Sequence, residues 1–148
     1  MITFNNLNNE KPYQLLKKKY HEALSAGQKN IEAISISSYN IETQEVDSRY
    51  VNLKFINNNE FIFFTNYNSP KSIAFSSHDQ ISALIYWPSI NVQIRMKARI
   101  QKTSNKFNQE YFKNRSKDKN ALAISSNQSS SISSFDQVIK KYNKIKKD

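Results

Sequence analysis

Hydrophobic and polar residues alternate with a period of two through much of the chain, which is the pattern of half-buried β-strands. The first such run begins at Ile31, where Ile34 and Ile36 alternate with serines, and it ends in the polar stretch Asn40–Glu45. Four more strands are expected at about 46–56, 61–65, 80–87 and 92–101. Three asparagines, 57–59, separate the second and third strands and predict a hairpin turn between them.

The fifth expected strand has the clearest alternation. Its apolar positions are Val92, Ile94, Met96, Ala98 and Ile100, and its polar positions are Gln93, Arg95, Lys97, Arg99 and Gln101. Such a strand has one face that can be buried and one that carries cations and amides.

Helical spacing replaces this alternation before and after the strands. A helix is expected from about Pro12 to Ala26, followed by Gly27, the only glycine, as its C-cap. Ser69 and Pro70 form the start of a short helix that ends near 77. Helices resume at Ser104 and again at Ser134, where a capping-box pattern begins, and residues 1–10 form a polar tail. The Ser-rich stretch 125–134 is expected to be a loop.

Five hairpin-compatible strands with helices before and after them predict a mainly β, α+β protein. We expect a small antiparallel barrel or curled sheet with flanking helices. The 148 residues fit a single domain, 1–148, which can bury a sizeable core without disulfides.

Composition excludes several kinds of site. The absence of cysteine removes thiol nucleophiles, thiolate metal sites and disulfides, and two histidines do not favour a metal centre. No glycine-rich phosphate loop or nucleophile elbow is present. No apolar run is long enough to cross a membrane and residues 1–10 are polar, so we expect a cytoplasmic protein.

The net charge of +10 is concentrated at one end. Residues 1–94 hold eight basic and eight acidic residues, whereas residues 95–148 hold fourteen basic and four acidic residues. This asymmetry suggests an anionic ligand or partner, such as a phosphorylated small molecule, nucleic acid or an anionic membrane. Eighteen lysines and nineteen asparagines also fit a general compositional bias.

Several polar and cationic side chains lie near the ends of the second and third strands. Arg49 and Lys54 flank an apolar run, Thr65 ends the third strand, and Ser69 and Lys71 stand at the start of a helix. Backbone N–H groups, a helix dipole and a lysine together suit a phosphate group.

Five segments, in order and at similar separations, resemble the pyridoxamine 5′-phosphate oxidase family. That family has an R-x-V-L-L-K strand, an F-Y-T-N-x-x-S-R-K hairpin exit, a W followed by R-Q-V, a Y-F-x-x-R helix and a K-Q-S-S loop. The corresponding segments here are 48–54, 63–71, 86–94, 111–115 and 128–130. The resemblance extends from about Pro12 to Tyr142.

The resemblance implies a Greek-key split β-barrel, a homodimer and one FMN at the subunit interface. Arg49 and Lys71 would lie near the FMN phosphate, Gln93 would reach the flavin, and Gln128 and Ser129 would come from the partner subunit. The cofactor-binding residues it implies are Arg49, Tyr50, Val51, Asn52, Leu53, Lys54, Phe64, Thr65, Ser69, Pro70, Lys71, Gln93, Gln128 and Ser129.

In the family a substrate phosphate meets a Lys, a Tyr, an Arg and a Ser. The corresponding residues here are Lys54, Tyr111, Arg115 and Lys119, the last of which replaces the serine. The implied reaction is oxidation of the substrate's C4′ amine or alcohol by hydride transfer to FMN, with dioxygen as the final acceptor. The resemblance assigns no residue of this chain a catalytic role and implies no metal.

The chain departs from the family pattern at several positions. Pro70 replaces an arginine that helps to hold the FMN phosphate, Val92 replaces the arginine before Gln93, and Phe64 replaces a tyrosine. The family's further strands, which carry a W, an R-x-H substrate motif and another FMN-contacting arginine, do not follow Asp148. These departures favour FMN binding over authentic pyridoxamine 5′-phosphate oxidation.

Two alternatives remain at this point. One is a flavin-binding protein without turnover, such as a flavin carrier, or a flavin-dependent reductase that acts on another substrate. The other is a basic barrel that binds nucleic acid through Arg95, Lys97, Arg99 and the carboxy-terminal lysines, which also fit a solvated helix face. Nucleic acid and membrane are not the expected partners.

Overall fold

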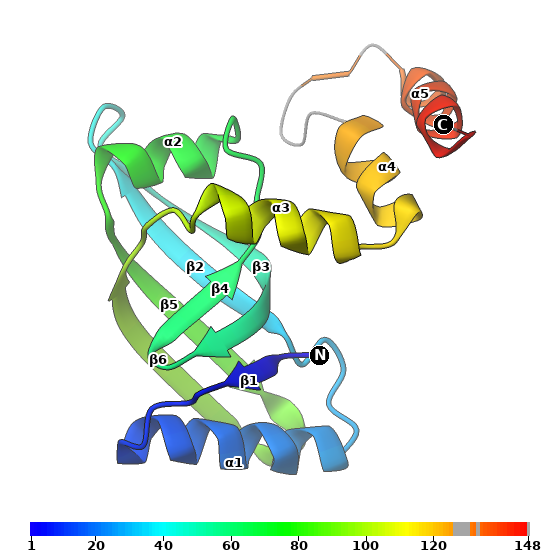
Figure 1. Cartoon of the computed structure of the whole chain (residues 1–148). Helices are drawn as coiled ribbons and strands as arrows, with labels where there is room; N and C mark the ends of the chain where they lie inside the picture. The colour runs from blue at the N-terminus through cyan, green and yellow to red at the C-terminus, as the bar shows by residue number, and fades with distance from the viewer. Residues whose placement is uncertain (126–130, 133, 148) are drawn as a thin grey trace. The chain divides into compact units, whose positions relative to one another are not determined.

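The computed structural model describes residues 1–125, 131–132 and 134–147. These residues form two compact units. The first contains residues 1–67 and 71–100, and the second contains residues 68–70 and the chain from 101 onward. The first unit contains the β-sheet and the second is helical (Figure 1).

Six strands make up the sheet of the first unit. Its hydrogen-bonded order is β1-β3-β2-β5-β6, and β4 also pairs with β3. The strands are β1 (Thr3–Asn5), β2 (Ala33–Asn40), β3 (Glu45–Asn57), β4 (Glu60–Phe63), β5 (Gln80–Trp87) and β6 (Val92–Arg99).

The long strand β3 connects two parts of the sheet. It pairs antiparallel with β2 along one stretch and with β4 along another, and its register shifts between Leu53 and Phe55. Such an irregularity bends a strand and increases its twist, which lets one strand belong to two differently oriented parts of a sheet. All pairings are antiparallel except that of β1 with β3. The expected split-barrel fold is therefore confirmed, as a mixed sheet that does not close.

One face of the sheet carries the buried core, and we call it the inner face. In β5 the alternation is regular, because Ile81, Ala83, Ile85 and Trp87 are buried and the residues between them are exposed. Trp87 is 1% exposed, and its indole Nε1 donates a hydrogen bond to the carbonyl of Ile31 at 3.1 Å. Burying the indole costs little because its one polar group has a partner.

Helix α1 (Lys11–Ser25) packs against this core through Leu16, Tyr20 and Ala23. Pro12 lies in its first turn, as expected, and Gly27 follows it with φ of +72°. A side chain would strain the backbone at that angle, which explains the only glycine of the chain.

Asparagine takes the place of glycine in other turns. Asn6, Asn30, Asn58 and Asn91 all have positive φ, and Asn58 joins β3 to β4. Asparagine is the residue other than glycine that best tolerates this conformation. The expected hairpin at 57–59 is confirmed.

Other helices occur in both units. Helix α2 (Pro70–Ser77) follows β4, and a short 3₁₀ turn, η1 (Pro88–Ile90), lies between β5 and β6. In the second unit, α3 (Asn105–Asn114) begins at Ser104, whose Oγ accepts a hydrogen bond from the Phe107 N–H. Helices α4 (Lys117–Ser125) and α5 (Phe135–Lys147) follow. Among the described residues, no helix combines the length and the hydrophobicity that a membrane span requires.

Two elements lie where the sequence pattern did not predict them. Strand β1 lies in the expected polar tail and α4 precedes the Ser-rich loop. Three residues are too few to show the alternation of a strand in the sequence. β1 is recognised only in the structure, by its pairing with Phe55, Ile56 and Asn57. Helix α4 lacks an apolar stripe and is joined to α5 by an ion pair between Lys146 and Asp118 at 2.8 Å.

Candidate cofactor site

A pair of cations lies where the first unit's sheet meets α2. Arg49 of β3 is 21% exposed, and its Nη1 donates a hydrogen bond to Ser38 Oγ of β2 at 2.7 Å. Burial, and then the nearby charge of Arg49, lower the pKa of Lys71 on α2. No carboxylate of the described residues lies within 4.0 Å of Lys71 Nζ, and Arg49 is 3.4 Å from the exposed Asp47. This cationic pair therefore favours an anion.

The segment between β4 and α2 adds a buried hydroxyl. Thr65 Oγ1 is inaccessible to solvent and has no hydrogen-bond partner among the described residues. A buried hydroxyl without a partner is costly, which points to a polar group that this segment is built to receive. Ser72 Oγ of α2 donates to the carbonyl of Asn66 at 2.8 Å and fixes the segment against the helix. Phe64 is half-buried and precedes Thr65.

The four residues after Arg49 divide between the two faces of β3. Val51 packs against the core and Leu53 is buried in it, whereas Tyr50 and Asn52 are exposed on the outer face. Val51 and Leu53 therefore shape the sheet, and Tyr50 and Asn52 are the two side chains available for contact on its outside.

Gln93 also lies on the outer face. It is exposed on β6 opposite Tyr86 of β5. Arg49 lies opposite Ile36, a buried residue, and so belongs to the inner face. The structure therefore brings Arg49 and Lys71 together but places Gln93 on the other side of the sheet.

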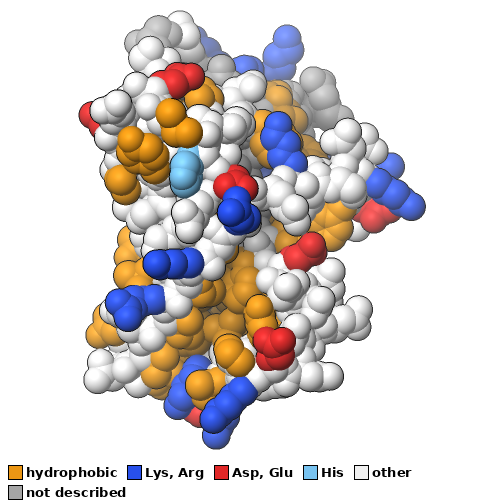
Figure 2. All heavy atoms as spheres, turned by 90° about the vertical axis from the view of Figure 1, so that its left-hand side faces the viewer, with side chains coloured by type: hydrophobic (Ala, Val, Ile, Leu, Met, Phe, Trp, Pro, Cys, Tyr) orange, Lys and Arg blue, Asp and Glu red, His pale blue; other side chains and the backbone are white. Residues whose placement is uncertain are grey.

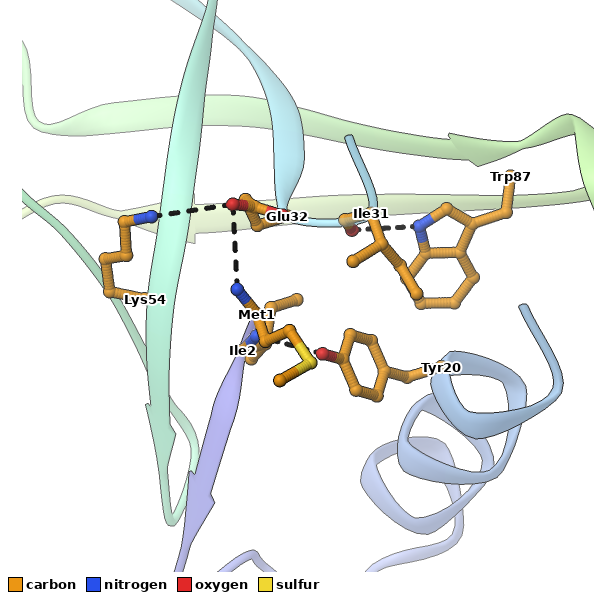
Figure 3. Close-up of polar contacts among 7 residues, drawn as sticks. All are labelled: Met1, Ile2, Tyr20, Ile31, Glu32, Lys54 and Trp87. Carbon is orange, nitrogen blue, oxygen red and sulfur yellow. Dashed lines mark hydrogen bonds and ion pairs between the residues drawn. The ribbon is translucent and has the colours of Figure 1, made fainter. Parts of the chain in front are cut away.

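Lys54 takes part in a separate ionic group. Its Nζ is 3.6 Å from Glu32 Oε1, and the amino terminus of Met1 is also 3.6 Å from that oxygen (Figure 3). Burial tends to raise the pKa of Glu32, but a backbone hydrogen bond and these two positive charges outweigh it and lower the pKa. Ile2 N–H donates to the Tyr20 hydroxyl at 3.0 Å and anchors the amino terminus beside this group.

The remaining predicted residues belong to the second unit. Tyr111 and Arg115 are half-buried, on α3 and directly after it, and Lys119 is exposed on α4. Arg115 lies over the Phe112 ring, 6.0 Å from its centroid, and lines a shallow cavity of about 640 Å³.

Among the other residues predicted to bind the cofactor, Ser69 is fully buried and Pro70 is exposed. Gln128 and Ser129 lie outside the described residues.

Sequence reasoning missed three residues that shape these sites. Ser38 and Asp47 contact Arg49, and Glu32 contacts Lys54. Ser38 and Asp47 are paired in register across β2 and β3, so a correct hairpin register would have found them. Glu32 directly precedes β2, and no sequence motif or periodic pattern marks it as part of a site.

The cationic pair fits the phosphate of FMN, the cofactor that the family resemblance implies. A phosphate dianion would accept charge-assisted hydrogen bonds from Arg49 and Lys71, and Lys71 is the second residue of α2, where the helix dipole also favours an anion. A phosphate or ribityl oxygen beside Thr65 would supply the partner that its hydroxyl lacks. The donor set therefore suits the phosphorylated end of this cofactor.

Comparison with curated proteins finds relatives named pyridoxine/pyridoxamine 5′-phosphate oxidase. The chain is 33% identical over 125 residues to a pyridoxine/pyridoxamine 5′-phosphate oxidase of Hydrogenovibrio crunogenus, over 84% of this chain and 57% of that protein. It is 31% identical over 137 residues to the oxidase of Leptospira biflexa, over 93% of this chain and 64% of that protein. The chain thus spans about three fifths of the length of these relatives. No protein-family model matches it.

Solved structures show the same fold. PhzG from Burkholderia lata, solved with tetrahydrophenazine-1-carboxylic acid, aligns with a TM-score of 0.85 and 20% identity over 92% of this chain and 67% of that one. A pyridoxamine 5′-phosphate oxidase-related, FMN-binding protein from Nostoc punctiforme aligns with a TM-score of 0.69 and 12% identity, over 90% of this chain and 73% of that one.

The relatives found by sequence indicate the family of this chain, and the solved structures show its fold. Both agree with the five ordered segments that extend from the second predicted strand to the Ser-rich loop. The chain therefore belongs among the relatives of the pyridoxine/pyridoxamine 5′-phosphate oxidases.

Proposed function

We propose that this protein binds FMN and acts, as a homodimer, as an FMN-dependent oxidoreductase on a phosphorylated small molecule. The observation that carries the proposal is the Arg49–Lys71 pair, in which two cations share a partly buried site with one exposed carboxylate nearby. Two like charges held this close destabilise the protein unless an anion joins them. The names of the relatives support phosphorylated vitamers as candidate substrates.

In this proposal Arg49 and Lys71 hold the FMN phosphate, and Thr65 donates to a neighbouring oxygen. Gln93 and, from the partner subunit, Gln128 and Ser129 complete the site. Gln93 and Arg49 of one subunit lie on opposite faces of the sheet. The variant Gln93→Leu tests this part separately from the phosphate site.

FMN, when bound, supplies a two-electron acceptor that dioxygen regenerates, which is the chemistry needed to oxidise an amine or alcohol by hydride transfer. The chain's own contribution is binding and orientation. Tyr111, Arg115 and Lys119 would hold the substrate phosphate together with Lys54, and a fixed phosphate restricts the position of the reacting carbon.

The homodimer is supported by the outer face of the sheet. Tyr50 is 77% exposed, Tyr86 is 55% exposed and Leu84 is 37% exposed. Tyr50 and Leu84 both lie beside Ser35 of β2, from opposite sides, so they flank a small residue on one surface. Exposed apolar side chains grouped in this way are typical of a protein interface.

The direct test is flavin binding. We expect the purified protein to bind FMN with a change in flavin absorbance and fluorescence, and to release FMN on denaturation. Lys71→Ala should weaken FMN binding by about one charge-assisted hydrogen bond, roughly 1.5–3 kcal/mol or tenfold to more than a hundredfold. Lys140→Ala, which removes an exposed lysine of α5, is the matched control. Equal FMN affinity in both variants would place the phosphate elsewhere.

A second function, flavin binding without turnover, is favoured by the ion pair of Lys54. This lysine would have to leave Glu32 to reach a substrate phosphate. A turnover assay with pyridoxamine 5′-phosphate and pyridoxine 5′-phosphate, followed by peroxide release, separates the two functions. Peroxide formation by the FMN-loaded protein supports the oxidase, and tight FMN binding without peroxide supports the carrier.

A further inference from the structure

A buried serine interrupts the apolar inner face of β2. Ile34 and Ile36 are buried on this face, and Ser38, the next residue along it, is only 2% exposed. The residue beside Ser38 on β5 is Ile81, which is also buried and has no polar group in its side chain. A hydroxyl in such surroundings costs free energy unless it has a hydrogen-bond partner, so its presence indicates a specific role.

The partner of this hydroxyl is Arg49. Ser38 lies directly opposite Asp47 of β3, so Arg49, two residues further along, is its diagonal neighbour on the same face. The Arg49 Nη1 donates to Ser38 Oγ at 2.7 Å. Because a hydroxyl oxygen is a neutral acceptor, this bond fixes the guanidinium without neutralising its charge. Several Lys and Arg side chains in Figure 2 project into solvent and need no such support, whereas Arg49 is only 21% exposed.

Asp47 holds the other side of the guanidinium more loosely. Its Oδ2 is 3.4 Å from Arg49 Nη2, and its side chain is 77% exposed. An exposed ion pair of this length contributes little to stability, since water can replace either partner at small cost. Arg49 therefore has one buried, neutral partner and one exposed, charged partner, on different nitrogens.

We propose that Ser38 positions Arg49 for the FMN phosphate and that Asp47 is a counter-ion which this phosphate displaces. The inference rests on the proposed function. The Nη1 bond to Ser38 would persist in both states, whereas Nη2 would face Asp47 in the FMN-free protein and donate to a phosphate oxygen when FMN is bound. Asp47 would thus offset the repulsion between Arg49 and Lys71 before FMN binds, and would compete with the phosphate for Arg49.

Removal of the Asp47 charge gives a test that damage to the fold cannot imitate. Asp47→Asn should bind FMN roughly two- to fivefold more tightly in a flavin fluorescence titration, because the competing carboxylate is gone. Without FMN the same variant should unfold at a lower temperature than wild type, because Arg49 and Lys71 then lack their counter-ion. Glu42→Gln, which removes one negative charge from the turn of the same hairpin, should change both properties much less. Unchanged or weaker FMN binding by Asp47→Asn would overturn the displacement.

Removal of the Ser38 hydroxyl tests the positioning role. Ser38→Ala should weaken FMN binding by about tenfold. Ser77→Ala is the matched control, because it removes a half-buried hydroxyl of α2 that donates only within its own helix, and it should leave FMN binding unchanged. In an Arg49→Met background the serine has no guanidinium to hold, so Ser38→Ala should then cost less than about twofold. An equal loss in both backgrounds would show a general effect on the core and would overturn the role of Ser38.

FMN binding by the wild-type protein separates failure of these roles from failure of the proposed function. Wild-type protein that binds no FMN would overturn both. Wild-type protein that binds FMN with the same affinity as Ser38→Ala and Asp47→Asn would overturn only the roles of Ser38 and Asp47, and would leave the proposal of a flavin-binding protein in place.

Discussion

At the scale of single residues, Lys71 has two opposite effects. Its positive charge would favour binding of the FMN phosphate, but the same charge destabilises the folded protein when FMN is absent. Its pKa in the folded protein lies below the ordinary value of 10.5, first because the amine is partly buried and then because Arg49 is close. Protonated Lys71 therefore destabilises the FMN-free folded state at neutral pH. The penalty disappears as the pH rises through the folded-state pKa towards that of the unfolded chain.

We predict that Lys71→Gln stabilises the FMN-free protein while it weakens FMN binding. The substitution removes the repulsion from Arg49 and keeps a side chain of similar length. Thermal unfolding at pH 7 without FMN should show a higher midpoint than wild type, and an FMN titration should show a lower affinity. The control Lys140→Gln should change neither. A lower unfolding midpoint for Lys71→Gln would contradict the repulsion inferred here.

Glu32 has the opposite dependence on pH. Its pKa lies below the ordinary 4.5 because a backbone hydrogen bond, the amino terminus and Lys54 favour the carboxylate more than burial disfavours it. A lowered pKa contributes stability above pH 4.5 that is lost as the pH falls through the folded-state value. We therefore predict that Glu32→Gln lowers the unfolding midpoint at pH 7 and that the difference from wild type shrinks towards pH 3. A difference that is independent of pH would exclude this ionic group as its source.

At the scale of elements, β1 pairs with β3, and the residue before it is anchored by a hydrogen bond that it donates to the core. The backbone N–H of Ile2 donates to the Tyr20 hydroxyl, and Tyr20 is 3% exposed on α1. Tyr20→Phe keeps the ring in place beside Phe4 and Trp87 but leaves this buried N–H without a partner. We predict a loss of about 1–3 kcal/mol in the free energy of unfolding, measured by urea denaturation. Tyr13→Phe, at a less buried position of the same helix, should cost much less.

The elements that sequence predicted well are those with a strong period or a specific cap. Residues 92–99 alternate between apolar and polar through eight residues, and they form β6, in which half-buried and exposed residues alternate as far as Lys97. Ser104 and Gly27 mark helix ends, because a side-chain acceptor and a positive φ are needed there. Strand β1 has three residues and α4 has no apolar stripe, so neither had a period to detect.

The candidate site also contains residues that the sequence predicted and residues that it did not. Arg49 and Lys71 could be predicted together because the family motif places both beside a phosphate, and the structure brings them together. Ser38 and Glu32 could not, because their roles depend on the register of β2 against β3 and on the position of the amino terminus. Such contacts join residues distant in sequence, and no local pattern encodes them.

At the scale of the whole molecule, the proposed dimer makes the outer face of the sheet part of the cofactor site. Tyr50 of β3 lies on the same face as Leu84 and Tyr86 of β5, and together with Gln93 of β6 they would be covered by the second subunit. An apolar side chain transferred from water into an interface stabilises it by roughly 25 cal/mol per Å². A carboxylate placed at Leu84 would lie opposite Arg95, and formation of the dimer would remove both charges from water.

We therefore predict that Leu84→Glu dissociates the dimer and weakens FMN binding in the same variant. The side chain is only 37% exposed but lies between Ser35 and Arg95, so a carboxylate fits the free subunit better than the interface. Leu15→Glu, at a 49% exposed position of α1, is the matched control and should leave both properties unchanged. Light scattering gives the mass, and an FMN titration at the same protein concentration gives the affinity. A dimeric Leu84→Glu protein would move the interface away from this face, whereas a monomer with undiminished FMN affinity would show that one subunit holds the cofactor alone.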